Sequence, residues 1–331
     1  MRKKLKPTPK PMNHPQNIAP PTSVERDHST SALQVLYLAF GYRYLVMAIY
    51  SAIGARRSGT LAHFKLITNL PVRSVRIYDE EPFDDIVVID SSNKENRYAK
   101  IRILDFADGT ASLYLDCDTV IQTPLHQFVP ALSKFDVALR PHPYSTKWEF
   151  GIGQGSTSKD AAICEFNSGV FFFSRTPGAK ELFRLWGKYF HEMGFDRDQP
   201  SLLKAFMEAK STRLLPLGTG WNAIPSPNHD MEFIRERPND VRIIHYKGGP
   251  LFWPNAGPAL ASIHRHCVIE TFSSKTGLEQ ERYEFSQVAR YLENPLFRYE
   301  LGRRLIHWQL KRKGRPFGLR MKGERDKSRA K

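Results

Sequence analysis

The chain has 331 residues, of which 41% are hydrophobic and 25% are charged, so neither a largely disordered chain nor a fibrous repeat fits it. This length allows one large domain or two small ones, and it can bury a full core without disulfide bonds. The three cysteines are far apart, which excludes a disulfide-rich scaffold and a zinc ribbon and favours a reducing compartment.

The formal net charge of +15 comes from the two terminal segments. Residues 1–24 contain five basic side chains and no acidic one, and residues 301–331 contain twelve basic and two acidic side chains. The residues between them are therefore balanced in charge. A basic nucleic-acid-binding core is not supported, and no nucleic-acid partner is expected.

The first part of the chain predicts a flexible arm followed by a buried strand and a helix. Residues 1–30 include a segment rich in Pro and Lys, which is typical of a disordered arm. Residues 33–53 are largely apolar, but Arg43 would lie near the middle of a membrane span at a cost of about 2.5–3.5 kcal/mol. We therefore interpret this stretch as a strand at 33–40, a turn at Gly41 and a helix at 42–55.

Short apolar runs then alternate with helical patterns as far as about residue 250. The apolar runs predict strands at 64–68, 86–89, 112–115, 135–139, 170–173 and 241–244. The helical patterns predict helices at 98–106, 124–132, 178–192 and 199–209. This alternation is typical of an α/β domain with a mainly parallel sheet flanked by helices. Residues 141–162 are rich in Pro, Gly and Ser and predict a mobile loop, which we expect to close over bound substrate.

A different pattern begins after residue 285. Phe297, Leu301, Leu305 and Trp308 recur on one face of a predicted helix, and basic residues surround or follow them. Such a segment either packs on the preceding domain or lies on an anionic membrane surface, and amphipathicity does not separate the two. The predicted organisation is a disordered basic arm (1–30), an α/β domain (31–284) and a basic amphipathic helical tail (285–331).

The most informative segment is S-L-Y-L-D-C-D-T-V at 112–120. It is an apolar strand followed by Asp116 and Asp118, and open α/β sheets bind ligands at the C-terminal ends of their strands. Carboxylates two residues apart on an extended chain point the same way, so this pair can flank a hard cation such as Mg²⁺ or Mn²⁺. An Asp-rich turn without a cation is the alternative for so short a motif.

Four segments in a fixed order give this motif its context. They are Y-A-K at 98–100 with Y-L-D-C-D at 114–118, F-N-S-G-V at 166–170, D-Q-P at 198–200 with L-P and W-N after it, and I-H-Y-K-G-G at 244–249. Over residues 33–253 the chain resembles nucleotide-diphospho-sugar glycosyltransferases of the GT-A fold, nearest to families 8 and 77. The resemblance implies a GT-A-like, Rossmann-type domain that moves a sugar, such as a hexose, from a nucleoside-diphosphate sugar to a hydroxyl acceptor, with retention of configuration favoured.

The resemblance also implies roles for individual residues. It assigns a divalent metal, Mn²⁺ in preference to Mg²⁺, to Asp116, Asp118 and His245, with Asp116 also near the ribose. It assigns Asp198 and Gln199 to the sugar hydroxyls or the reacting centre. The other donor-binding positions that it implies are Ala39, Phe40, Gly41, Lys100, Asn167, Ser168, Lys247 and Gly248.

Several of these positions have a plain structural interpretation as well. Gly41 can form a strand-to-helix turn, and Lys100 can be a solvated helix lysine. His245 can be a satisfied histidine at a strand end, and Asp198 can cap a helix. The late motif also departs from the usual family 8 order of His, Gly and then Lys-Pro-Trp, because Lys247 follows His245 by only two residues.

Two other functions fit part of the sequence. The run L-D-C-D-T-V at 115–120 also matches the first motif of haloacid-dehalogenase-like phosphatases, in which Asp116 would be the nucleophile and Asp118 the general acid or base. That motif normally opens its domain, whereas strands and helices are predicted before it here. A non-catalytic nucleotide-sugar-binding module is the other alternative.

The basic tail favours a glycan or lipid-linked acceptor, as in polysaccharide biosynthesis, and peripheral contact with an anionic membrane. We therefore expect a cytoplasmic protein that can associate with the inner face of the membrane.

Overall fold

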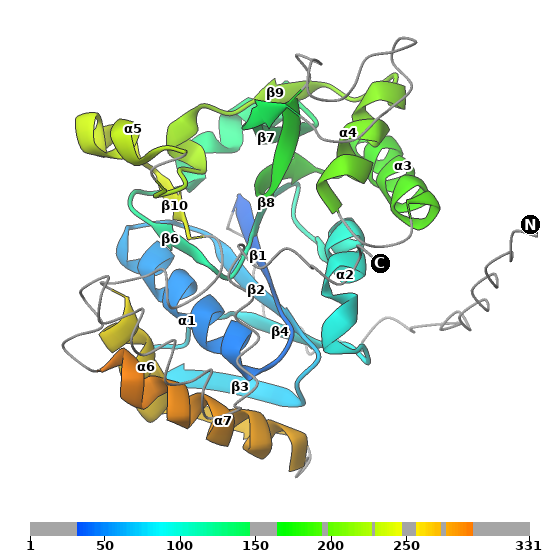
Figure 1. The fold of residues 1–331 in the computed structure, drawn as a ribbon. Coiled ribbons are helices and arrows are strands. Elements are labelled where there is room, and N and C mark those ends of the chain that lie inside the picture. Colours follow the sequence, from blue (N-terminus) through cyan, green and yellow to red (C-terminus); the bar gives the residue numbers. More distant parts are fainter. Residues whose placement is uncertain are drawn as a thin grey trace, which may run out of the picture.

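Figure 1 shows a central sheet with helices packed on it, in a computed structural model that describes residues 32–145, 164–193, 198–226, 229–246, 256–272 and 276–293. Within these residues the sheet has seven strands, in the order β4-β2-β1-β5-β8-β7-β9. Their bounds are Asp85–Val88 (β4), His63–Thr68 (β2), Leu33–Ala39 (β1), Ala111–Leu115 (β5), Cys164–Ser174 (β8), Val137–Ser145 (β7) and Leu214–Pro216 (β9).

Most strand pairs in this sheet are parallel. β1 pairs in parallel with β2 and β5, β2 with β4, and β7 with β9, whereas β8 is antiparallel to both of its neighbours. Every residue of β1 and β5 is buried, which explains why both strands are largely apolar, with only Gln34 and Ser112 as polar members. The prediction of an α/β domain with a mainly parallel, helix-flanked sheet is confirmed.

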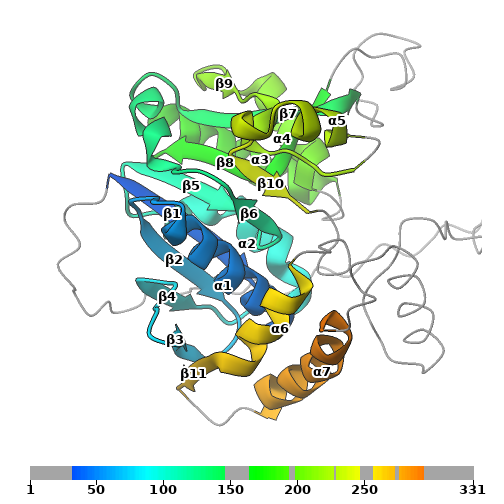
Figure 2. The same ribbon diagram turned by 90° about the vertical axis from the view of Figure 1, so that its left-hand side faces the viewer.

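Alternate residues of β1 belong to two hydrophobic cores, one on each face of the sheet. Val35 and Tyr37 pack in a core shared with α1, α6 and α7. Leu36 and Leu38 pack in a second core with α2, α3 and α4, and Figure 2 shows α1 on the near side of the sheet. The helices are α1 (Tyr42–Arg57), α2 (Asn96–Ile101), α3 (Pro177–Glu192), α4 (Asp198–Glu208), α5 (Met231–Glu236), α6 (Gly257–His266) and α7 (Thr276–Leu292).

The apolar stretch 33–53 folds as predicted, into a strand, a turn and a helix. β1 ends at Ala39, and α1 begins at Tyr42. Between them Gly41 has a φ of +85°, a conformation that a residue with a Cβ atom rarely adopts. Among the described residues, no helix has both the length and the apolar character that a membrane span requires.

Some predicted elements have different ends or a different form. The helix predicted at 124–132 is a 3₁₀ helix, His126–Ser133, and its internal Pro130 lacks the N–H group that an α-helix uses there. The helix predicted at 98–106 divides into α2 and a 3₁₀ helix, Ile103–Phe106. Residues 141–145 are strand rather than the predicted loop, because β7 continues its pairing with β8, and the rest of that loop lies outside the described residues.

Two small antiparallel ribbons lie beside the main sheet. β3 (Val72–Ile77) pairs with β11 (Cys267–Thr271), and β6 (Thr119–Ile121) pairs with β10 (Ile243–His245). Since β6 follows the acidic motif directly, the second ribbon brings the end of β10 to that motif.

Helix α7 runs through residue 285, where the predicted tail begins. Phe285 is buried, and its ring packs edge-on against the ring of Tyr42 in α1. The predicted arm 1–30 and the tail beyond residue 293 lie outside the described residues, so the division into arm, domain and tail stays a prediction.

Asp136, just before β7, predicts a loss of stability in acid. Burial alone would raise the pKa of this carboxyl, but hydrogen bonds from Arg213 and from Thr176 outweigh it and lower the pKa to about 2. Because the folded-state pKa lies below the unfolded value near 3.8, the ionised pair stabilises the fold above about pH 4. We expect on the order of 2 kcal/mol of the free energy of unfolding to be lost as the pH falls from 4 to below 2.

Urea unfolding between pH 6 and pH 2.5 measures this loss, with Asp136→Asn as the comparison. The variant is less stable at pH 6, and its stability falls less steeply in acid. If the free energy of unfolding fell with pH equally steeply in both proteins, Asp136 would not be a source of the acid sensitivity.

Candidate active site

The two carboxylates of the acidic motif lie at the C-terminal end of β5, with a histidine from a distant part of the chain beside them. Asp116 follows β5 directly, and Asp118 precedes β6. In the β6–β10 ribbon, Thr119 pairs with His245, and the backbone N–H of Tyr246 donates to the carbonyl of Asp118 at 2.8 Å. The ribbon therefore holds His245 at the motif.

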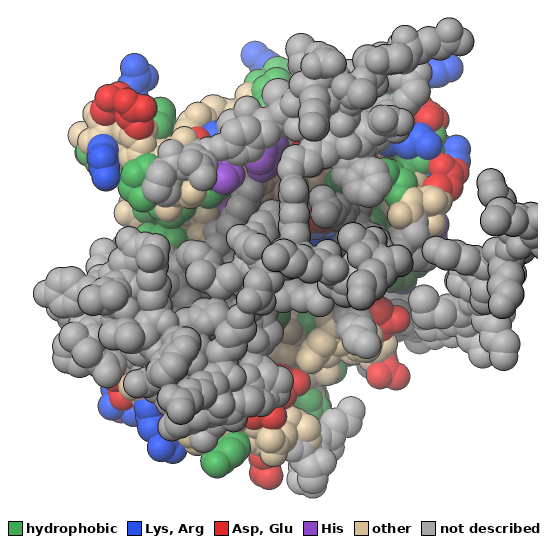
Figure 3. Space-filling model, viewed as in Figure 1, with side chains coloured by type: hydrophobic (Ala, Val, Ile, Leu, Met, Phe, Trp, Pro, Cys, Tyr) green, Lys and Arg blue, Asp and Glu red, His purple; other side chains and the backbone are tan. Residues whose placement is uncertain are grey.

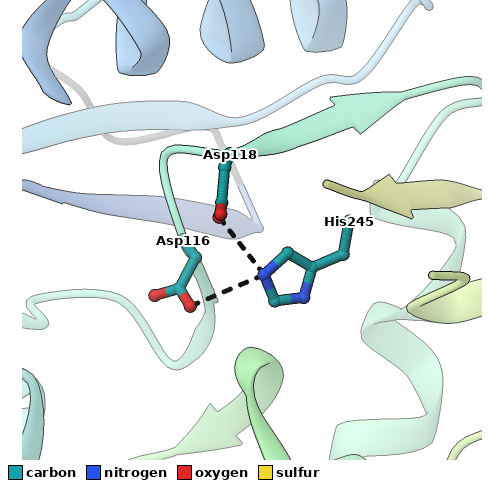
Figure 4. A group of neighbouring side chains, drawn as sticks. All are labelled: Asp116, Asp118 and His245. Atoms are coloured by element: carbon teal, nitrogen blue, oxygen red, sulfur yellow. Dashed lines mark ion pairs between the residues drawn. The ribbon is translucent and has the colours of Figure 1, made fainter. Parts of the chain in front are cut away.

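Figure 4 shows the side chains of Asp116, Asp118 and His245 converging. The Nε2 atom of His245 lies 3.2 Å from Oδ1 of Asp118 and 3.8 Å from Oδ2 of Asp116. One ligand atom from each residue lies within 4.8 Å of the others, and the imidazole is only 4% exposed. The structure thus brings together the three residues for which a shared metal was expected.

Asn222 fixes which nitrogen of His245 faces the carboxylates. Its Oδ1 atom lies 2.9 Å from Nδ1 of His245, so that Nδ1 carries the proton and donates it. With Nδ1 bonded to Asn222, Nε2 is the nitrogen that faces the two carboxylates and is placed to bind a cation between them. Two carboxylates and one neutral imidazole suit Mn²⁺, and this donor set therefore fits the metal implied by the motif.

Gly169 leaves the space into which these side chains converge. The N–H group of Asp116 donates to the carbonyl of Gly169 at 2.7 Å, in the pairing between β5 and β8. A Cβ atom on Gly169 would lie 2.2 Å from Cε1 of His245 and 2.7 Å from Oδ2 of Asp116. No larger residue fits here without displacing the side chains of His245 and Asp116.

A second group of charges adjoins the first through Asp116. The Nζ atom of Lys100, on α2, lies 2.9 Å from Oδ1 of Asp116 and 3.3 Å from Oδ2 of Asp198. The hydroxyl of Ser168 donates to the same oxygen of Asp198 at 2.7 Å, and that of Tyr114 donates to Asp116 at 2.7 Å. Lys100 was expected at the diphosphate of the donor, Ser168 and Asp198 were expected at its sugar, and the structure brings the three together.

Electrostatics keep both members of the Lys100–Asp198 pair charged. Burial opposes the charge of Lys100, but the carboxylates of Asp116 and Asp198 outweigh it and raise the pKa of the ammonium group. Burial likewise opposes the charge of Asp198, but Lys100 and the hydroxyl of Ser168 lower its pKa. Lys100 is 8% exposed, so its interpretation as a solvated helix lysine is wrong.

Asp198 begins α4, and its backbone and side chain have different partners. Its carbonyl accepts hydrogen bonds from the indole N–H of Trp186 at 2.9 Å and from the hydroxyl of Ser201 at 2.8 Å. Its carboxylate is turned to Lys100 and Ser168. Gln199, the next residue, is half-buried.

Asn167, also expected at the donor sugar, is 1% exposed and lies next to Ser168 in β8. Its Oδ1 atom accepts the N–H of Gly169 at 2.9 Å, which fixes the backbone beside His245 and Asp116. Its Nδ2 atom has no hydrogen-bond partner among the described residues. A buried donor of this kind normally binds an ordered water or a ligand.

Of the remaining expected donor-binding residues, the structure describes those at the end of β1. Ala39 and Phe40, at the end of β1, are buried in opposite cores, so their side chains pack rather than face solvent. Next to them, the N–H of Gly41 donates to Oδ1 of Asn69 at 2.9 Å. Lys247 and Gly248 lie outside the described residues.

Sequence reasoning missed three residues that contact the expected site. Asn222 and Gly169 were visible within the W-N and N-S-G motifs, but only the fold shows that they touch His245 and Asp116. Glu281, on α7, gave no sequence signal. Its carboxylate accepts the N–H of Tyr42 at 2.5 Å, beside Gly41, and thereby ties α7 to the turn after β1.

The buried position of Lys100 predicts a large loss of stability when its charge is removed. Lys100→Met leaves Asp116 and Asp198 without their cation, and we expect the free energy of unfolding to fall by about 3 kcal/mol. Lys188→Met, which removes a half-exposed lysine 4.0 Å from Glu192, should change it far less. Urea unfolding of both variants tests the difference, and similar small losses would contradict it.

Several solved structures resemble the fold weakly. Apo mouse xyloside xylosyltransferase 1 is 8% identical, with a TM-score of 0.43, and the match covers 65% of this chain and 97% of that one. Apo glycosyltransferase GlyE from Streptococcus pneumoniae TIGR4 is 17% identical, with a TM-score of 0.45 and coverages of 78% and 62%. Galactosyltransferase LgtC, in complex with donor and acceptor sugar analogs, is 15% identical, with a TM-score of 0.43 and coverages of 79% and 96%. Nothing about substrate or mechanism follows from likenesses of this strength.

Comparison of sequences gives a firmer result. No curated protein matches the chain. The sequence model described as Glycosyl transferase family 8 matches residues 69–256, which include the acidic motif, Lys100, Asp198, Asn222 and His245. This match covers more than half of the chain, and the chain belongs to glycosyl transferase family 8.

Proposed function

We propose that this glycosyltransferase moves a sugar from a nucleoside-diphosphate sugar to a hydroxyl acceptor, with Mn²⁺, or Mg²⁺ in its place, as cofactor. The observation that carries the proposal is the convergence of Asp116, Asp118 and His245 on one position, with the imidazole held by Asn222. Family membership supports sugar transfer, and the donor set of two carboxylates and one imidazole supports the metal.

Asp116, Asp118 and His245 hold the metal, which when bound neutralises charge on the leaving nucleoside diphosphate. Lys100 holds Asp116 in place through its 2.9 Å ion pair and adds fixed positive charge beside the leaving group. The nucleoside lies at the end of β1 near Gly41, and Lys247 and Gly248 contact the diphosphate.

Asp198 and Gln199 act at the donor sugar. Because the pKa of Asp198 is lowered, its carboxylate is ionised at neutral pH and accepts hydrogen bonds from sugar hydroxyls or from the acceptor. Asn167 and Ser168 also face the donor sugar. We favour retention of configuration, and proton NMR of the anomeric centre in the fresh product distinguishes retention from inversion.

The acceptor is a glycan or a lipid-linked hydroxyl, and the basic tail touches the anionic inner face of the membrane. This part of the proposal rests on sequence alone, because residues 294–331 lie outside the described ranges. Co-sedimentation with anionic vesicles, for the full chain and for a chain that ends at residue 293, tests it. Equal pelleting of the two proteins counts against a membrane role for the tail.

Donor hydrolysis across a panel of nucleotide sugars tests the activity. We expect one donor to release its nucleoside diphosphate with Mn²⁺ present and to stop doing so when EDTA removes the metal. Release of phosphate from simple monoesters would instead support a phosphatase, and metal-dependent donor binding without turnover would support a binding module.

A further inference from the structure

Asn222 is held in place by a buried ion pair on the side away from His245. Its backbone carbonyl accepts a hydrogen bond from Nη1 of Arg140, in β7, at 2.7 Å. The same guanidinium binds both carboxylate oxygens of Asp230, at 2.5 and 2.7 Å. The side chains of Arg140 and Asp230 are only 6% and 7% exposed, and Asn222 is fully buried.

Asp230 and β10 hold the residues that follow Asn222. The carboxylate of Asp230 accepts the N–H of Ile224 at 2.8 Å. The N–H of Ala223 donates to Ile243, and the N–H of His245 donates to the carbonyl of Ala223 at 2.8 Å. The segment 222–224 is thus clamped between the ion pair and the strand that carries His245.

We propose that Arg140 and Asp230 are positioning residues that orient His245 for metal binding by fixing Asn222. A buried ion pair by itself does not show a gain in stability, because apolar residues of similar volume often stabilise a protein equally well. What apolar residues cannot supply is the directed bond to the carbonyl of Asn222. Without that bond Asn222 is free to shift, and the imidazole loses the hydrogen bond that fixes its orientation.

Within the described residues, the side-chain hydrogen bonds of Arg140 and Asp230 go to each other and to the segment 222–224, not to the acidic motif or His245. His142, two residues after Arg140, packs its ring edge-on against His229, with centroids 5.8 Å apart. Figure 3 shows histidine side chains, in purple, at the surface between the positions of β7 and β10 in Figure 1. The pair therefore acts on the site through Asn222 rather than as a ligand.

A charge-neutral double variant, Arg140→Met with Asp230→Leu, removes the clamp without leaving one charge buried alone. This inference rests on the proposed metal role of His245, so two measurements are needed. Proton–nitrogen NMR of ¹⁵N-histidine-labelled, metal-free protein reports whether the bond to Asn222 protects the Nδ1–H of His245 from exchange with water, with His245→Gln for assignment. Titration with Mn²⁺ alone reports the affinity.

We expect the wild-type spectrum to show an Nδ1–H signal of His245 that exchanges slowly with water, and the double variant to lose this protection. We also expect the double variant to bind Mn²⁺ about 10- to 100-fold more weakly. Arg213→Met, which cuts the Arg213–Asp136 pair just before β7, should change neither result. Unchanged protection of Nδ1–H in the double variant overturns the positioning role. A protected Nδ1–H in the wild type without Mn²⁺ binding overturns the metal assignment and leaves the positioning role standing.

Discussion

Asp118→Asn should lower the rate of Mn²⁺-dependent sugar transfer by about 10³-fold, a loss of about 4 kcal/mol of transition-state stabilisation. The amide keeps the shape of the side chain but removes one of the two negative charges that face His245. Affinity for Mn²⁺ should fall as well. The metal-free protein should keep its unfolding midpoint, because the substitution also relieves repulsion between two carboxylates less than 5 Å apart.

The matched control is Asp105→Asn, in the 3₁₀ helix Ile103–Phe106. Its carboxylate is 55% exposed and pairs with Arg102 on the surface. This variant loses the same charge and should transfer sugar at the wild-type rate. If Asp118→Asn retained full activity and full Mn²⁺ affinity, Asp118 would not be a ligand.

Gly169→Ala should lower the rate of sugar transfer nearly as much as Asp118→Asn does, although it adds only a methyl group. That group would lie 2.2 Å from Cε1 of His245 and 2.7 Å from Oδ2 of Asp116, so both side chains must move. Displacements of about 1 Å at a reacting site cost on the order of 10²-fold in rate, and overpacking destabilises a core by about 1–3 kcal/mol. We expect both effects, measured by turnover and by urea unfolding.

Gly187→Ala supplies the comparison. Gly187 lies within α3, and its added Cβ would meet only Cγ2 of Ile101, at the ordinary contact distance of 3.8 Å. Replacing a glycine inside a helix by alanine should stabilise the protein by about 0.5–1 kcal/mol and leave turnover unchanged. If Gly169→Ala behaved like Gly187→Ala, the packing around His245 would be looser than the structure indicates.

The parts of the fold that were predictable are those that local patterns encode. β1, α1 and the turn at Gly41 follow from an apolar run, a glycine and a helical period, and the structure has all three. The 3₁₀ helix at 126–133 was predicted as an α-helix because its amphipathic pattern masked the effect of Pro130. β3 and β11 went unpredicted because each gains its stability from a partner far along the chain.

In the candidate site, too, local patterns predict only the residues whose placement does not depend on distant parts of the chain. Asp116 and Asp118 were predictable from the strand before them, since the C-terminal end of a parallel strand is where ligands bind. His245 was expected only through a family resemblance, because its approach depends on the pairing of β10 with β6. The contacts of Asn222 with Arg140 and His245 join three distant segments, and no local pattern encodes them.

The most direct test is anomalous diffraction at the manganese edge from crystals of the full chain soaked in Mn²⁺ and nucleoside diphosphate. We expect one strong peak within bonding distance of Nε2 of His245 and of a carboxylate oxygen of Asp118, with Asp116 beside it and phosphate oxygens on its open side. A peak bound elsewhere, or a nucleotide seated at the end of β1 with no metal between its phosphates and these three side chains, would contradict the proposal.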